Sequence, residues 1–118
     1  MFKKCIFILA TSCMMYSCTT QTETNPFLTE FQTEHGVPPF DKIKLEHYEP
    51  AFLKGIEEQN ANIDAIVNNS EAPTFENVIV ALDNSSPILD RVSAIFYNMT
   101  EAETTDDLKE LSIKLAPT

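Results

Sequence analysis

The 118-residue chain is short of basic residues, glycine and tryptophan. It has 8 lysines and arginines against 18 acidic residues, a formal net charge of −10 with both histidines neutral. Phosphate recognition needs clustered Lys and Arg, so this charge argues against a nucleic-acid partner. With 2 glycines and no tryptophan, neither a glycine-rich phosphate loop nor a repeat array is expected. The 43% of hydrophobic residues is still enough for one small folded domain.

Catalytic and metal-binding patterns are also missing. There is no H-E-x-x-H sequence, and the 2 histidines, His35 and His47, fall in different segments. Because a zinc site needs several protein ligands, we interpret both as surface or packing residues. The adjacent acids at positions 57–58 and 106–107 are interpreted as solvated helix faces. We therefore predict that the chain contains no catalytic residue and no metal ligand.

All 3 cysteines lie in the first 18 residues, in a pattern typical of export. Lys3 and Lys4 precede an apolar run that is shorter than the roughly 20 residues needed to span a bilayer. A basic start and a short apolar core are typical of a secretory signal peptide. The run ends at Ser17-Cys18, and a small residue before a cysteine resembles the lipobox of bacterial lipoproteins. Cys13 also follows a serine, but it would leave a much shorter apolar core.

This use of cysteine favours cleavage before Cys18. The mature chain would then have one cysteine, available for a lipid anchor, and no internal disulfide. We predict a lipoprotein signal peptide over residues 1–17, lipidation at Cys18 and a polar tether over residues 18–24. The protein would be exported and anchored in a membrane of the bacterial envelope, facing the periplasm or the cell surface. The alternatives are an ordinary cleaved signal and an uncleaved hydrophobic tail.

Residues 25–118 predict an all-α fold with an extended N-terminal arm and about three antiparallel helices. Prolines make residues 25–44 irregular, and no β pattern is present. Apolar residues then recur at helical spacing over three stretches: Glu46 to Val67, Thr74 to Met99, and Thr104 or Thr105 to Leu115.

Local signals refine these helices. Thr74 is a predicted N-cap, with Asn77 at the position where a capping box carries Glu or Gln. Pro87 predicts a kink, or a helix break with Ser86 as a second N-cap. Gly55 is unfavourable inside a helix by about 1 kcal/mol, which suggests a close contact with another helix.

Other signals concern the two ends of the helical region. Pro50 is expected near the first turn of its helix, where a missing N–H does no harm. Leu108, Leu111 and Leu115 form a stripe near the end of the chain, and we expect it to be uncovered. Since a domain this small barely offsets its folding entropy, marginal stability and weak cooperativity are also expected.

Several sequence blocks resemble a known family. They are NPF at 25–27, PPFDKI at 38–43, HYEPAF at 47–52, EAPTFENVIVAL at 71–82, and LDRV at 89–92 with FYNM at 96–99. These blocks are similar to the N-terminal part of bacterial dipeptidyl carboxypeptidases, which belong to the thimet-oligopeptidase family of zinc metallopeptidases.

The resemblance implies the N-terminal portion of a larger helical enzyme. Such enzymes shorten oligopeptides in a deep channel, and this branch releases dipeptides from the C-terminus. Their zinc is bound by H-E-x-x-H and a downstream glutamate, and it polarises the attacking water. None of these ligands is among the 118 residues, so zinc is expected only in the full-length enzyme and the chain alone is expected to be inactive. The segment would wall one side of the channel.

Two functions are therefore considered. The first is a fragment of a lipid-anchored zinc peptidyl-dipeptidase, truncated before the catalytic domain that would be its partner in cis, with short oligopeptides as substrates. The second is a free-standing small helical lipoprotein that binds a partner or a peptide.

Lipidation at Cys18 has a direct test. Mass spectrometry of the membrane fraction should find an N-terminal acylated cysteine at this position, because a lipidated thiol is the only anchor that the predicted mature chain offers. A soluble mature chain beginning at another residue would contradict the prediction, as would a Cys18→Ala variant that stays in the membrane.

Overall fold

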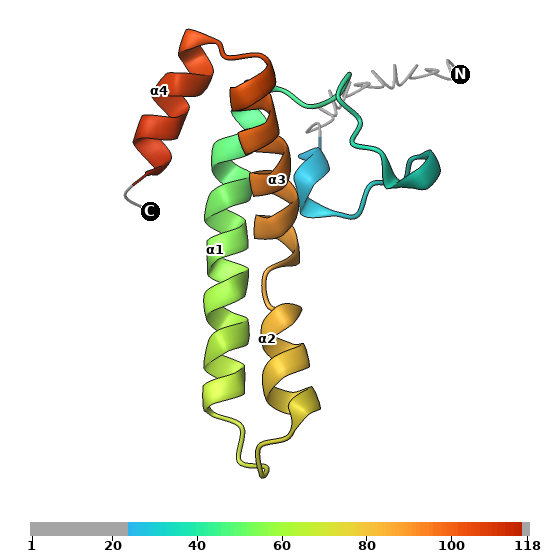
Figure 1. Ribbon diagram of the computed structural model, residues 1–118, viewed down its shortest axis with the longest axis vertical. Helices are drawn as coiled ribbons and strands as arrows, with labels where there is room; N and C mark the ends of the chain where they lie inside the picture. The colour runs from blue at the N-terminus through green and yellow to red at the C-terminus, as the bar shows by residue number, and fades with distance from the viewer. Residues whose placement is uncertain (1–23, 117–118) are drawn as a thin grey trace, which may run out of the picture.

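The computed structural model describes residues 24–116, and within this range the chain is helical and has no strand. The chain forms a helical hairpin: α1 (Leu45–Val67) is the first arm, and residues 75–102 form a second arm antiparallel to it (Figure 1). Helix α4 (Asp106–Leu115) then turns back beside the end at which α1 begins. The all-α prediction is confirmed. In chain order the elements are η1 (Pro26–Leu28), η2 (Glu34–Gly36), α1 (Leu45–Val67), η3 (Phe75–Val80), α2 (Ala81–Asp83), α3 (Pro87–Ala102) and α4 (Asp106–Leu115).

Helix α1 forms the first arm of the hairpin and buries one face through apolar residues three and four positions apart. Tyr48, Ala51 and Phe52 are all buried on this face. Since the helix begins at Leu45, Pro50 lies in the second turn, and the prediction that its missing N–H does no harm is wrong. There its missing N–H leaves the Glu46 carbonyl without a helical donor. Pro50 is exposed, so water can satisfy this carbonyl.

The close contact predicted at Gly55 is confirmed. A Cβ atom at this position would lie 2.7 Å from the backbone nitrogen of Leu89 and 2.9 Å from its Cα. Gly55 is buried, so the backbones of α1 and α3 approach each other at this point with no room for a side chain.

The second arm is broken before Pro87, which is the first residue of α3, and Ser86 is the N-cap as predicted. The buried Ser86 hydroxyl donates to the Asp90 carboxylate at 3.1 Å, while the Ser85 carbonyl accepts from the Asn62 side chain at 2.8 Å. These bonds satisfy polar groups that the break exposes inside the hairpin.

The first part of this arm differs from the expected α-helix. Residues Phe75–Val80 form the π-helix η3, a winding for which sequence periodicity gives no signal. Its capping box is confirmed: Thr74 Oγ1 accepts from Asn77 N at 3.1 Å, and Asn77 Oδ1 accepts from Thr74 N at 2.7 Å. Asparagine therefore fills the role that Glu or Gln usually has.

An aromatic cluster joins the N-terminal segment to the hairpin. Phe27 is 0% exposed, with its ring centroid 5.1 Å from that of Tyr48, and Tyr48 is 5.2 Å from Phe96. Two hydrogen bonds hold the same segment: Arg91 donates to the Phe27 carbonyl at 2.7 Å, and Asn25 Nδ2 donates to the His47 carbonyl at 2.7 Å.

Helix α4 begins after Thr105, which is one of the two predicted start positions, and it completes the core. The expectation that its leucines are uncovered is wrong. Leu108 is only 7% exposed, and Leu111 and Leu115 pack against the core. The short loop before Thr105 lets α4 fold back, so its stripe covers the ends of α1 and α3 that the aromatic cluster occupies.

We predict that Gly55→Ala lowers the melting temperature of the chain. Alanine normally favours a helix interior by about 1 kcal/mol, but here the added methyl group would force the Leu89 backbone away, at a cost of about 1–3 kcal/mol. Thermal unfolding followed by circular dichroism measures the shift.

The matched control is Ala61→Gly, at an exposed position of the same helix. It should be destabilising by about 1 kcal/mol through helix propensity alone. Gly55→Ala and Ala61→Gly should therefore both destabilise, whereas propensity alone would give them opposite signs. A raised melting temperature for Gly55→Ala would contradict the close approach.

Candidate functional site

The predicted lipidation site, Cys18, lies outside the described residues, together with the predicted signal peptide and nearly all of the tether. No helix of residues 24–116 is long and apolar enough to cross a membrane.

The two histidines have different surroundings. His35 is exposed in η2 with φ of 59°, and its ring lies 3.5 Å from the Glu34 carboxylate. His47 is buried, and its Nδ1 atom accepts a hydrogen bond from the backbone N–H of Lys44 at 3.1 Å. His47 thus caps the start of α1 and has a structural role. A histidine at this position is not a usual capping signal in a sequence.

The neighbouring acids serve the helices. Glu57 and Asp106 each pair with a lysine three residues away, at 2.8 and 3.1 Å, on exposed surfaces. The prediction that Glu58 is simply solvated is wrong. Its Oε2 atom accepts a hydrogen bond from the backbone N–H of Ile88, in the first turn of α3, at 3.4 Å. A carboxylate is favourable at that end of a helix. Among residues 24–116, no three His, Cys, Asp or Glu side chains are grouped to hold a metal ion.

The largest unexplained feature is an apolar surface on the second arm, which we call the η3–α2 face. It consists of Phe75, Ile79 and Leu82, which are 65%, 51% and 51% exposed. They lie four and three positions apart along the arm. No residue of η3 or α2 is buried. Grouped exposed apolar side chains are typical of interaction surfaces.

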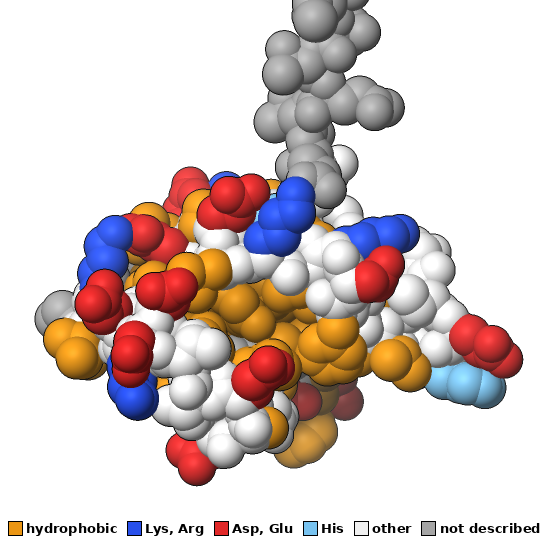
Figure 2. Space-filling view, turned by 90° about the horizontal axis from the view of Figure 1, so that it is seen from above, with side chains coloured by type: hydrophobic (Ala, Val, Ile, Leu, Met, Phe, Trp, Pro, Cys, Tyr) orange, Lys and Arg blue, Asp and Glu red, His pale blue; other side chains and the backbone are white. Residues whose placement is uncertain are grey.

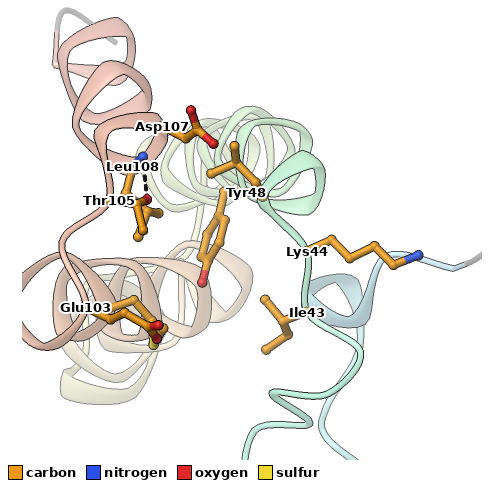
Figure 3. A pocket seen from close by; sticks show the side chains of 9 residues that line it. Ile43, Lys44, Tyr48, Glu103, Thr105, Asp107 and Leu108 are labelled. Carbon is orange, nitrogen blue, oxygen red and sulfur yellow. Dashed lines mark hydrogen bonds between the residues drawn. The ribbon is translucent and has the colours of Figure 1, made fainter.

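A pocket of about 210 Å³ lies at the opposite end of the hairpin, between the start of α1, the end of α3 and the start of α4. Figure 2 views this end, where apolar side chains gather at the centre with charged side chains around them. Tyr48 lines the pocket together with Ile43, Met99 and Leu108, and Figure 3 shows its hydroxyl pointing into the space near Ile43 and Glu103. Burial raises the pKa of Tyr48, so its phenol is neutral at pH 7.

Comparison with known proteins identifies relatives of one kind. The chain is 43% identical over 88 residues to a dipeptidyl carboxypeptidase of Salmonella typhimurium, and 42% identical over 90 residues to that of Escherichia coli. It is also 30% identical over 87 residues to oligopeptidase A of Escherichia coli. These matches cover 75%, 76% and 74% of this chain.

The chain resembles the N-terminal part of a dipeptidyl carboxypeptidase. The predicted resemblance is therefore confirmed. The matched residues span only 13% of the two dipeptidyl carboxypeptidases and 12% of oligopeptidase A. No family model matches the chain.

The η3–α2 face should bind a hydrophobic fluorescent dye. We predict that the double variant Phe75→Ser/Ile79→Ser lowers dye fluorescence at least about twofold, because it removes most of the grouped apolar surface. Its melting temperature should change little, since both side chains are more than half exposed.

Ile113→Ser is the matched control, because Ile113 is 75% exposed on α4, away from the η3–α2 face. It should leave dye fluorescence nearly unchanged. An equal loss in the control and the double variant would show that dye binding does not depend on this face.

Proposed function

We propose that the chain is the N-terminal segment of a lipid-anchored zinc peptidyl-dipeptidase. The match to two dipeptidyl carboxypeptidases over three quarters of the chain supports this most strongly. The enzyme would release dipeptides from the C-termini of short oligopeptides. This segment would wall one side of the substrate channel and contribute no catalytic residue.

The η3–α2 face is the surface through which we expect the segment to pack on the rest of the enzyme. Phe75, Ile79 and Leu82 present apolar area that no residue between 24 and 116 covers. Burying such area against a partner stabilises a complex by roughly 25 cal/mol per Å². A catalytic domain in cis would supply the cover, and the hairpin would then be held rigidly at the edge of the channel.

Zinc belongs to that catalytic domain in this proposal. No group of residues between 24 and 116 is arranged to hold it, and the H-E-x-x-H pattern is not in the sequence. The chain alone should therefore neither retain zinc after dialysis nor cleave peptides. Acylated Cys18 would hold the enzyme at a membrane of the bacterial envelope, with residues 18–24 as the tether.

A chimeric enzyme tests the proposed function. Residues 25–116 of this chain replace the matching segment of the Escherichia coli dipeptidyl carboxypeptidase. We expect the chimera to retain dipeptide release within about tenfold of the parent rate, equivalent to about 1.4 kcal/mol. Phe75→Asp in the chimera should lower its melting temperature and its activity, because a charge would be buried in an apolar interface.

Asn69→Asp is the control, since it introduces the same charge at an exposed position outside the η3–α2 face. It should leave the chimera active. An inactive chimera that unfolds like the parent would argue against the channel role. Equal effects of Phe75→Asp and Asn69→Asp would argue against the proposed packing surface.

The second function is a free-standing helical lipoprotein that binds a partner or a peptide. The burial of Leu108 favours this second function. Helix α4 closes the core at one end of the hairpin by contacts within residues 24–116. In that case the chain alone should unfold in one sharp transition, and adding the catalytic part of a relative should not change it.

A further inference from the structure

The pocket beside Tyr48 has no role in the proposed function. Tyr48 is only 4% exposed, yet its hydroxyl makes no hydrogen bond within residues 24–116 and is not sealed from solvent. A tyrosine hydroxyl can both donate and accept a hydrogen bond, so this oxygen is available to a group in the pocket. Since the hydroxyl points into the pocket, a bound group can supply the partner that the described residues do not (Figure 3).

The charges around the pocket favour a cation. Glu103 and Asp107 line it, while the ammonium group of Lys44, another lining residue, points away from it in Figure 3. Glu103 is also the C-cap of the 16-residue helix α3, whose C-terminal end carries partial negative charge. The phenol of Tyr48 is neutral, so its oxygen can accept a hydrogen bond from a bound ammonium group.

The remaining walls favour an apolar chain of limited length. Ile43, Leu45, Met99 and Leu108 supply hydrophobic contacts. The volume of about 210 Å³ equals that of roughly seven water molecules in the liquid, which suits a chain of about four to six carbons.

We propose that this pocket binds an alkylammonium group, with the ammonium between the Tyr48 hydroxyl and the Glu103 carboxylate and the carbon chain against Ile43, Met99 and Leu108. The group can belong to a free monoamine or to a lysine side chain of a peptide. Binding does not depend on the peptidase proposal, because every residue involved lies within the described part of this chain.

Titration of the full chain in detergent micelles with n-butylammonium chloride tests the proposal. Met99 is the one methionine of residues 24–116, so its labelled methyl group reports on the pocket by NMR. We expect a saturable shift with a dissociation constant of about 1 mM, within the range that a ligand of this size can reach. n-Butanol has the same chain without the charge and should bind at least about tenfold more weakly, and butyrate should not bind.

Variants separate charge from packing. Glu103→Gln should weaken butylammonium binding about tenfold, and Tyr48→Phe, which keeps the aromatic ring, about threefold to tenfold. Glu101→Gln removes a charge from the same end of α3 without touching the pocket, and it should leave binding unchanged. Circular dichroism of each variant confirms that the helices persist.

Two results would overturn the proposal: no saturable shift up to about 50 mM butylammonium, or butanol binding as tightly as butylammonium. Nα-acetyl-lysine methylamide distinguishes the two sources. Binding at least as tight as that of butylammonium supports a lysine side chain as the ligand, whereas weaker binding supports a free amine.

Discussion

The burial of Phe27 between α1 and α3 is the interaction on which the arrangement of the other elements depends. Its ring lies against that of Tyr48, which in turn contacts the ring of Phe96. The ring centroids of Phe96 and Phe52 are 5.4 Å apart. Aromatic contacts of this kind add to the stabilisation from burial itself. The Arg91 guanidinium fixes the same segment by donating to the Phe27 carbonyl and lying 5.7 Å from the centroid of the Phe31 ring. The short 3-10 helix η1 therefore connects α1 to α3, which are separated by residues 68–86 in the sequence.

This arrangement divides the hairpin into two unequal halves. The buried residues of α1 end at Gly55, where its backbone lies against that of Leu89 with no room for a side chain. Beyond Gly55, α1 faces η3 and α2, neither of which buries any residue. The first half has a closed core with α4 over it. The second half has helical backbone but no core, and the entropy of ordering its residues is offset by helical hydrogen bonds, a few polar contacts across the hairpin and partial apolar contacts.

The sequence predicted what depends on local chemistry. Helix positions followed from apolar spacing, and the N-caps Thr74 and Ser86 followed from their residue types. The π-helix was missed because its winding changes no residue pattern. The burial of Leu108 was also missed, since it depends on where the loop after α3 directs α4.

The candidate sites were less predictable, because they too depend on how distant segments pack together. The sequence blocks pointed to the peptidase family, and that resemblance is confirmed. In contrast, no pattern around Tyr48 indicates a pocket, because its walls come from the start of α1, the end of α3 and the start of α4. The exposure of Phe75 could not be predicted either, since an apolar stripe in a sequence does not reveal whether a partner is present.

The open half of the hairpin carries the block EAPTFENVIVAL, the most specific resemblance in the sequence, and this bears on the choice between the two functions. In a free-standing lipoprotein, Phe75 and Ile79 would stay in contact with water until a partner arrived, and such a surface promotes aggregation. In a segment of a larger peptidase, the same side chains would be covered as the chain folds. The closed half can fold by its own core in either case. A cover would stabilise the open half, and the resemblance of this half to part of a much longer enzyme favours the proposal that the cover lies within the same protein.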